Sequence, residues 1–274
     1  MPTIPTCLEN NFQPMNKTKS CELFVGDHKG NIYVFTFFYP RTLLFARTYS
    51  LGTQVIRYQD LKSHGNYVKC KVIKNAHDNI VDKIHYIPQK NILLSCSKLD
   101  PVNSLALRDL TTNGSRTYRH PLGVTCFDFN HTRNVLASGS KDFSVRLWTI
   151  SSLEPTHVLE GHKAVIADLR IHEQRNTIVS ACKEGEVRMF DMKTGRCLHT
   201  IRISLPFPLH HLQFGKSALH LPCHDSDHLL MTVNDLTTKI CLDDMEGLNR
   251  RVASALALGT TGFGFESRRR HGCL

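Results

Sequence analysis

Three residues of the types that serine hydrolases use lie close together in the middle of the chain. They are Ser138, Asp142 and the upstream His120. A serine, a histidine and an aspartate can supply a nucleophile, a general base and the group that orients the base. However, no Gly-x-Ser-x-Gly turn surrounds this serine, as it does in α/β-hydrolases. We therefore favour a structural role for the three side chains and expect a protein that is not an enzyme.

A second concentration of reactive side chains lies in the segment LHHLQFGKSALHLPCHDSDHLL. Cysteine and histidine at short spacing can bind zinc, and the candidate ligands are His220, Cys223, His224 and His228. Their spacing fits none of the common zinc-finger patterns. A solvated, His-rich loop between two strands is the favoured interpretation, and we expect no cofactor.

The chain is basic, with 34 Lys and Arg against 24 Asp and Glu and a formal net charge of +10. This balance permits contact with anionic partners and leaves RNA binding open as an alternative function. The basic residues are scattered, however, and the one tight run is Arg268 to Arg270 near the end. No phosphate-binding loop of the Gly-x-x-x-x-Gly-Lys type and no dinucleotide fingerprint is present. Because the basic residues are scattered, we do not expect nucleic acid to be the partner.

The ten cysteines include no Cys-x-x-Cys pair, and several lie in apolar, strand-like runs. A cysteine in such a run behaves as a small buried hydrophobe. The N-terminus lacks the basic start and apolar block of a secretory signal. The most apolar window, residues 32–45, is interrupted by Pro40 and Arg41. These features favour an intracellular, cytoplasmic protein with no membrane contact.

A strand pattern repeats at a nearly constant interval. It places an apolar residue, two others, an apolar residue, one other and a third apolar residue. The pattern is found at Val81-Ile84-Tyr86, Val124-Phe127-Phe129, Ile166-Leu169-Ile171 and Leu209-Leu212-Phe214. Its central positions, 84, 127, 169 and 212, are 43, 42 and 43 residues apart. A period of about 40–45 residues with several strands per repeat is typical of propeller blades.

Each copy continues into a hairpin, of which NVLASGSKDFSVRLW, residues 134–148, is the clearest. It ends in Trp148, the single tryptophan of the chain. Related hairpins are predicted at residues 21–37, 91–110, 176–191 and 228–242. The blades would then span about 20–75, 76–118, 119–158, 159–203 and 204–242.

The two ends of the chain do not follow the repeat. Residues 1–19 are polar and are predicted to be a flexible lead-in, so that the first blade lacks its inner strand. Residues 243–274 form a non-repeat tail with a possible short helix at 243–258, so that the last blade lacks its outer strand.

Together these features resemble WD repeats. In that family a blade carries Gly-His, then a Ser or Thr in the second strand, an Asp in the next turn and a Trp that closes the third strand. The blade at 119–158 matches with His120, Ser138, Asp142 and Trp148, although Arg119 replaces the glycine. The resemblance implies that these side chains form a buried hydrogen-bond network.

The other copies match less completely. The following blade has Gly161-His162, Ser180, Glu184 in place of Asp, and Phe190 in place of Trp. The remaining matches are His77, Ser95, Asp100 and Arg108 in the blade before, Leu205, Thr232 and Leu242 in the last blade, and Phe35 in the first hairpin.

The resemblance implies an all-β fold, a β-propeller of WD-repeat type with four-stranded antiparallel blades. We count about four to five blades, whereas a member of the family usually closes a ring of about seven. The sequence thus indicates an incomplete propeller, and we interpret it as a truncated or alternative form of a longer WD-repeat protein.

The resemblance also implies a function. Propellers of this kind usually hold loops on a rigid rim where other proteins dock, so a non-enzymatic protein–protein interaction scaffold is expected. A substrate receptor of a ubiquitin ligase is an alternative, but the Trp-Asp-x-Arg motif of such receptors is replaced by Trp148-Thr149-Ile150-Ser151. The loose repeats further resemble the long WD-repeat forms that carry EF-hands, which would imply a cilium or flagellum.

Overall fold

The computed structural model describes residues 3–11, 20–38, 58–62, 65–66, 68–202, 211–215, 228–233, 236–241 and 257–258. These residues form five antiparallel sheets of four strands each, and each sheet uses four strands that are consecutive in the chain. The only helical element within the described ranges is the short 3-10 helix η2, Tyr58–Lys62.

Each sheet follows the previous one along the chain. The first sheet contains β1 (Pro5–Asn11), β2 (Ser20–Asp27), β3 (Ile32–Phe38) and β4 (Val68–Ile73). The second contains β5 (Lys83–Ile87), β6 (Ile92–Cys96), β7 (Leu105–Asp109) and β8 (Ser115–Tyr118). The third contains β9 (Val124–Asn130), β10 (Val135–Ser140), β11 (Val145–Thr149) and β12 (His157–Leu159). The fourth contains β13 (Ile166–His172), β14 (Thr177–Cys182), β15 (Glu186–Asp191) and β16 (Cys197–Arg202). The fifth contains β17 (His211–Gly215), β18 (His228–Val233), β19 (Leu236–Cys241) and β20 (Ala257–Leu258).

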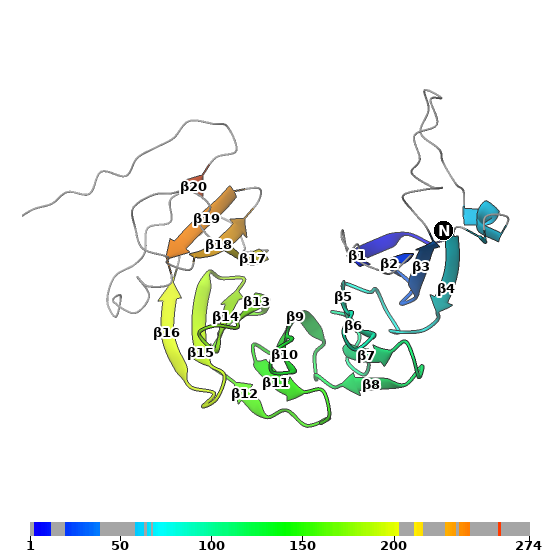
Figure 1. Cartoon of the computed structure of the whole chain (residues 1–274). Helices are drawn as coiled ribbons and strands as arrows, with labels where there is room; N and C mark the ends of the chain where they lie inside the picture. The colour runs from blue at the N-terminus through cyan, green and yellow to red at the C-terminus, as the bar shows by residue number, and fades with distance from the viewer. Residues whose placement is uncertain are drawn as a thin grey trace, which may run out of the picture.

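The five sheets stand side by side along an open arc, with the first and the fifth at its two ends (Figure 1). The first strand of each sheet lies on the inner side of the arc and the last strand on the outer side. Inner strands of successive sheets touch, as in the pairs β1–β5, β9–β13 and β13–β17. This is the arrangement of propeller blades, so the prediction of an incomplete WD-type β-propeller is confirmed.

The core lies between the blades and explains the sequence pattern. The middle strands β6 and β14 are buried at every position, because each packs on a neighbour through both faces. A strand covered on both faces is apolar throughout and does not alternate. Alternation is found in the outer strands instead, as in β4 with its buried ends and exposed Lys69 and Lys71.

Close contact between blades 3 and 4 requires a glycine. A Cβ atom on Gly139 would lie 2.6 Å from Cγ2 of Ile166 and 2.8 Å from Sγ of Cys126. Gly26 holds the same place in blade 1, where a Cβ would lie 2.6 Å from Sγ of Cys7 and 2.8 Å from Cβ of Val81. Neither strand could carry a side chain there without the next blade moving away.

The lead-in prediction for residues 1–19 was wrong at residues 5–11, which form β1, the inner strand of the first blade. The segment is polar because its side chains are half-buried or exposed. It is held as a strand by pairing with β2 and by contacts to the next blade. The hydroxyl of Thr6 and the thiol of Cys7 both donate to the carbonyl of Val81. Tertiary pairing thus replaces the apolar periodicity that the sequence lacks.

The other end of the propeller also differs from the expectation. The fifth blade has an outer strand, β20, and its two residues pair with Thr237 and Thr238 of β19. The helix predicted at 243–258 is therefore wrong at Ala257 and Leu258, while residues 243–256 lie outside the described part of the chain. Two residues that complete a sheet carry no periodic signal of their own.

The strand registers test the repeat alignment. Leu136 of β10 lies opposite Trp148, and the equivalent pairs are Leu23–Phe35, Leu93–Arg108 and Ile178–Phe190. In the fifth blade Leu212 lies opposite Met231, and Leu229 lies opposite Ile240. Met231 and Ile240 therefore hold the Ser and Trp positions there, in place of Thr232 and Leu242. The insertion at 216–227 hid this shift, because it changes the spacing between the two strands.

Candidate functional site

The polar residues of blade 3 meet in one buried cluster. Nε2 of His120 lies 2.8 Å from Oγ of Ser138, and the indole N–H of Trp148 donates to the same Oγ at 2.8 Å. The three side chains come from the loop before β9, from β10 and from β11, and all are at most 2% exposed. Rigid strands thus bring together residues that are up to 28 positions apart in the chain.

Arg146 determines the protonation of this cluster. One of its terminal nitrogens lies 2.6 Å from Nδ1 of His120, and a guanidinium can only donate. Nδ1 is therefore the acceptor, and Nε2 carries the proton that is donated to Ser138. Asp142 does not touch His120; its carboxylate pairs with Arg146 at 2.8 Å and accepts from the hydroxyl of Ser144 at 2.6 Å.

This tautomer is the opposite of the one that a hydrolase needs. A catalytic histidine must accept the serine proton on Nε2 and donate from Nδ1 to a carboxylate. Here Nε2 donates, a cation occupies Nδ1, and the Ser138 oxygen is buried beneath Trp148. The Ser138–His120–Asp142 set thus lacks an accessible nucleophile and the base that would activate it.

Burial and the neighbouring charges also suppress the basicity of the ring. Burial, reinforced by the Arg146 charge, lowers the pKa of His120 from 6.5 to about 3. The ring is therefore neutral at physiological pH and serves as a hydrogen-bonding bridge. Burial of Asp142 by itself would raise its pKa, but hydrogen bonds from Ser144 and Arg146 outweigh this and hold the pKa below 3.8.

Blade 4 repeats the His–Ser contact with different partners. Nε2 of His162 lies 2.7 Å from Oγ of Ser180. The acidic residue beside this histidine is Glu186, whose Oε1 lies 3.6 Å from Nδ1, and not Glu184, which is exposed in the turn. Glu186 also accepts from Arg188 at 2.6 Å and from Arg202 at 3.2 Å. Phe190 replaces the tryptophan with its ring 6.4 Å from His162 and offers no N–H to Ser180.

Blade 2 has the same His–Ser contact with a third set of partners. Nε2 of His77 lies 2.8 Å from Oγ of Ser95, and Nδ1 faces the backbone carbonyl of Asn103. The carboxylate of Asp100 is buried and accepts from three backbone amides, those of Asp78, Val102 and Asn103. In all three clusters the buried serine oxygen and Nε2 of the histidine are partners. In blade 4, Nδ1 of His162 has the Glu186 carboxylate 3.6 Å away and makes no hydrogen bond.

The same turns form one rim of the propeller. The carbonyl of Ser97 accepts from the amide of Val124 at 3.3 Å, and the carbonyl of Gly123 accepts from the Ser140 hydroxyl at 2.7 Å and from the Lys141 amide at 3.4 Å. These bonds join the β6–β7 turn, the β8–β9 loop and the β10–β11 turn. Four large apolar side chains on these segments are exposed, and we call them the apolar rim: Leu99 (54%), Val102 (52%), Leu122 (57%) and Phe143 (41%).

Phe143 adopts an unusual backbone conformation. Its φ is +68°, in the left-handed region. The other described non-glycine residues with positive φ are all asparagines, and glycine holds the equivalent turn position in blades 1 and 4, at Gly30 and Gly185. A bulky residue in this region costs about 1–2 kcal/mol. Outliers of this kind concentrate at functional sites.

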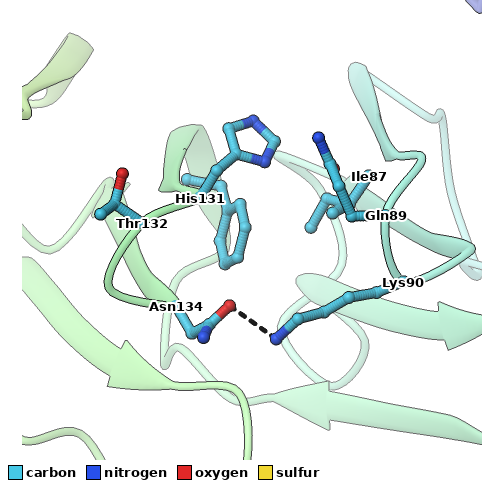
Figure 2. Close-up of a pocket in the computed structure, with 7 residues that line it drawn as sticks. Ile87, Gln89, Lys90, His131, Thr132 and Asn134 are labelled. Carbon is cyan, nitrogen blue, oxygen red and sulfur yellow. Dashed lines mark hydrogen bonds between the residues drawn. The ribbon is translucent and has the colours of Figure 1, made fainter.

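Cavities on the described surface also lie away from this rim, and two of them are large enough to consider. One, of about 260 Å³, lies on the opposite rim between the β5–β6 and β9–β10 turns, where Nζ of Lys90 bonds Oδ1 of Asn134 across it (Figure 2). It is smaller than a typical ligand pocket. The other, of about 670 Å³, lies between η2 and β4 and includes Tyr58, Leu61 and Cys70 in its wall. Burial raises the pKa of the Cys70 thiol, which disfavours the reactive thiolate.

Of the four zinc candidates, His228 begins β18. His220, Cys223 and His224 lie outside the described residues. Within the described part of the chain, no group of three or more His, Cys, Asp or Glu side chains is arranged to hold a metal ion. Nor does that part contain a helix long and apolar enough to cross a membrane.

Sequence reasoning missed three residues that matter here: Arg146, Glu186 and Phe143. A signal existed for Phe143, because a glycine is found at its place in the neighbouring blade. For Arg146 and Glu186 there was no signal, since they follow the turn and their direction depends on the strand register.

Comparison with known proteins supports the repeat assignment. The family model for the WD domain, G-beta repeat, matches residues 113–149 and 153–191, the third blade and most of the fourth. The chain is 24% identical over 207 residues to "WD repeat-containing protein on Y chromosome" of Drosophila grimshawi, covering 73% of this chain and 18% of that protein. It is 26% identical over 225 residues to the protein of the same name from Anopheles gambiae, covering 72% of this chain and 21% of that protein.

A further relative is "Mitochondrial division protein 1" of Candida glabrata, 22% identical over 183 residues, which cover 63% of this chain and 25% of that protein. The chain thus spans about a fifth to a quarter of the length of these curated relatives. The fold and the matches together define a protein with WD40 repeats in an incomplete propeller, and they support the WD-repeat family. They do not support the closer resemblance to the EF-hand forms.

Proposed function

We propose that the chain is a non-enzymatic scaffold on which other proteins dock through the rim formed by the β6–β7 and β10–β11 turns and the β8–β9 loop. The observation that carries this proposal is the apolar rim. Its four side chains are each 41–57% exposed, whereas the His–Ser pairs of blades 2 and 3 are buried. Exposed apolar side chains gathered on segments that are bonded to one another favour an interaction surface.

The remaining geometry supports a scaffold. The polar clusters of blades 2, 3 and 4 hold the turns at fixed positions, because each ties a loop to the strands through buried hydrogen bonds. Each cluster uses its serine oxygen for this purpose. A rigid rim loses little conformational entropy when a partner binds.

Chemical cross-linking in cells tests this proposal. The full chain would be expressed with a tag, cross-linked through lysine and analysed by mass spectrometry, and each partner would then be purified and its direct binding measured. We expect partner cross-links at Lys98 and Lys141 in the rim turns, with fewer at Lys193 in the turn after β15. Cross-links distributed evenly over the surface, with no partner binding directly in purified form, would contradict the scaffold role.

A further inference from the structure

The segments that carry the apolar rim contact one another across two blades. A Cβ atom on Gly123 would lie only 2.6 Å from the carbonyl oxygen of Lys98, so the loop that carries Leu122 packs directly on the turn that carries Leu99. The carbonyl of the same glycine accepts from Lys141, two residues before Phe143. The four apolar side chains therefore belong to three segments in direct backbone contact.

Phe143 is the member of this group that the fold itself does not require. The turn would adopt its positive φ more readily with glycine or asparagine, which hold every other described position of this kind. The side chain is 41% exposed, so it does not fill the core. An aromatic side chain kept in an unfavourable backbone conformation and directed toward solvent points to a contact outside the chain.

Basic side chains recur around the rim at one structural position. In blades 1, 2 and 3 one backbone amide bonds across the turn between the second and third strands, and it belongs to Asp27, Ser97 and Ser140. The position in question is the next residue along the chain. The position holds Lys98, Lys141 and Lys183 in blades 2, 3 and 4. In blade 1 it holds His28, whose Nδ1 accepts from the amide of Ile4. In blades 2 and 3 it brings two lysines next to the apolar rim, and the exposed Arg119 lies in the loop between them.

Within the described ranges, the acidic groups nearby leave two of these basic side chains without an ion-pair partner. Asp82 lies 3.5 Å from Lys98 and offsets that one lysine. Asp142 is paired with Arg146, and Asp100 is buried against backbone amides. Asp78 and Glu160 are exposed in the loops before β5 and β13. Among the described residues no ion pair involves Lys141 or Arg119, so two unpaired positive side chains lie within three residues of Phe143 and Leu122 in the chain.

From this combination we infer that the apolar rim binds an acidic peptide segment of a partner protein, with apolar side chains of the segment on Leu122 and Phe143 and carboxylates next to Lys141 and Arg119. The inference rests on the proposed scaffold function and adds the chemical class of the partner. Three of the four apolar residues are aliphatic and offer no platform for base stacking, which favours a peptide over RNA.

Selection from a random peptide display library tests this inference on the full chain. We expect the enriched peptides to combine Asp or Glu with Leu or Phe. The Kd of a synthetic copy should rise at least about tenfold in each of the variants Phe143→Asn, Leu122→Ser and Lys141→Glu. Leu153→Ser is the matched control, because Leu153 is equally exposed (57%) but lies in the β11–β12 turn at the other end of β11. It should leave the Kd unchanged.

Phe143→Asn separates recognition from folding. Asparagine suits a positive φ, so this variant should melt at the same or a higher temperature while losing affinity. A lower melting temperature would show that Phe143 serves the fold and would overturn its assigned role.

The remaining outcomes also decide between alternatives. Enriched peptides that are neutral or basic, or whose affinity is insensitive to the rim variants, would overturn the inference and leave the scaffold role standing. No enrichment at all, together with no partner in the cross-linking experiment, would overturn both. Binding of a uridine oligonucleotide or of vesicles containing phosphatidylserine that is lost in Lys141→Glu, with no peptide binding, would assign the rim to another class of partner.

Discussion

Blades 3 and 4 share a backbone register and a His–Ser hydrogen bond, yet they complete the buried cluster differently. In blade 3 the Ser138 oxygen accepts from both Trp148 and His120, and an arginine stands between the histidine and the aspartate. In blade 4 the Ser180 oxygen has no indole partner, and Glu186 lies directly beside the histidine. The repeat therefore conserves the position of the cluster in space, whereas the partners that satisfy it are exchangeable.

The largest expected effect comes from the aromatic side chains that close the third strand of each blade. Trp148→Ala should lower the free energy of unfolding by about 3–5 kcal/mol, because it removes a buried ring and a hydrogen bond together. Phe190→Ala should cost less, since no donor is lost. Urea unfolding followed by circular dichroism measures both. A Trp148→Ala protein as stable as the parent would show that the indole does not distinguish the cluster of blade 3 from that of blade 4.

Acid should destabilise both blades through their histidines. In the unfolded chain each ring has a pKa of 6.5. In the folded protein the pKa is about 3 for His120 and about 4 for His162. The unfolded chain therefore binds more protons below pH 6.5. The contribution of each neutral histidine to the free energy of unfolding is fully present above pH 6.5. It is lost as the pH falls toward the pKa of the folded state and amounts to on the order of 3–5 kcal/mol for a ring of this kind.

The measurement is urea unfolding at a series of pH values from 7.5 downward. In His120→Gln the decline between pH 6.5 and 4 should be shallower than in the parent, because the titrating ring is gone. An unchanged slope would show that His120 is not held neutral by the fold.

The serines distinguish the two clusters more finely. Ser138→Ala leaves two buried donors without a partner, the indole N–H and Nε2 of His120, whereas Ser180→Ala leaves one ring nitrogen. Each orphaned group costs about 1–3 kcal/mol. Ser138→Ala should therefore be the more destabilising substitution in denaturant melts. Equal effects would contradict the two-donor geometry of blade 3.

The smallest effect separates two neighbouring glutamates of blade 4. Glu186→Gln removes the charge that Arg188 and Arg202 share and should cost about 1–2 kcal/mol. Glu184→Gln, in the exposed turn, should change stability by less than about 0.5 kcal/mol. Thermal melts at neutral pH measure the difference. A larger loss of stability in Glu184→Gln than in Glu186→Gln would show that Glu184 is the structural residue.

Much of the architecture could be predicted because the pattern is periodic. Ile84, Phe127 and Leu169 recur at one interval, and each lies opposite the serine of its blade in the structure. Prediction failed where the periodic signal was weak or displaced. The polar strand β1 and the two-residue strand β20 lack apolar alternation, and the long insertion before β18 moved the fifth register by one residue.

The sequence by itself determined the blade repeat, the order of the strands and the positions of His120, Ser138 and Trp148. These follow from local alternation and constant spacing, which are properties of a strand and its neighbours in the chain. Only the tertiary structure decided which charged group faces each histidine, which end segments join a sheet, and which turns lie together on one rim. Those outcomes depend on contacts between blades and on backbone angles such as the φ of Phe143, which no linear spacing encodes.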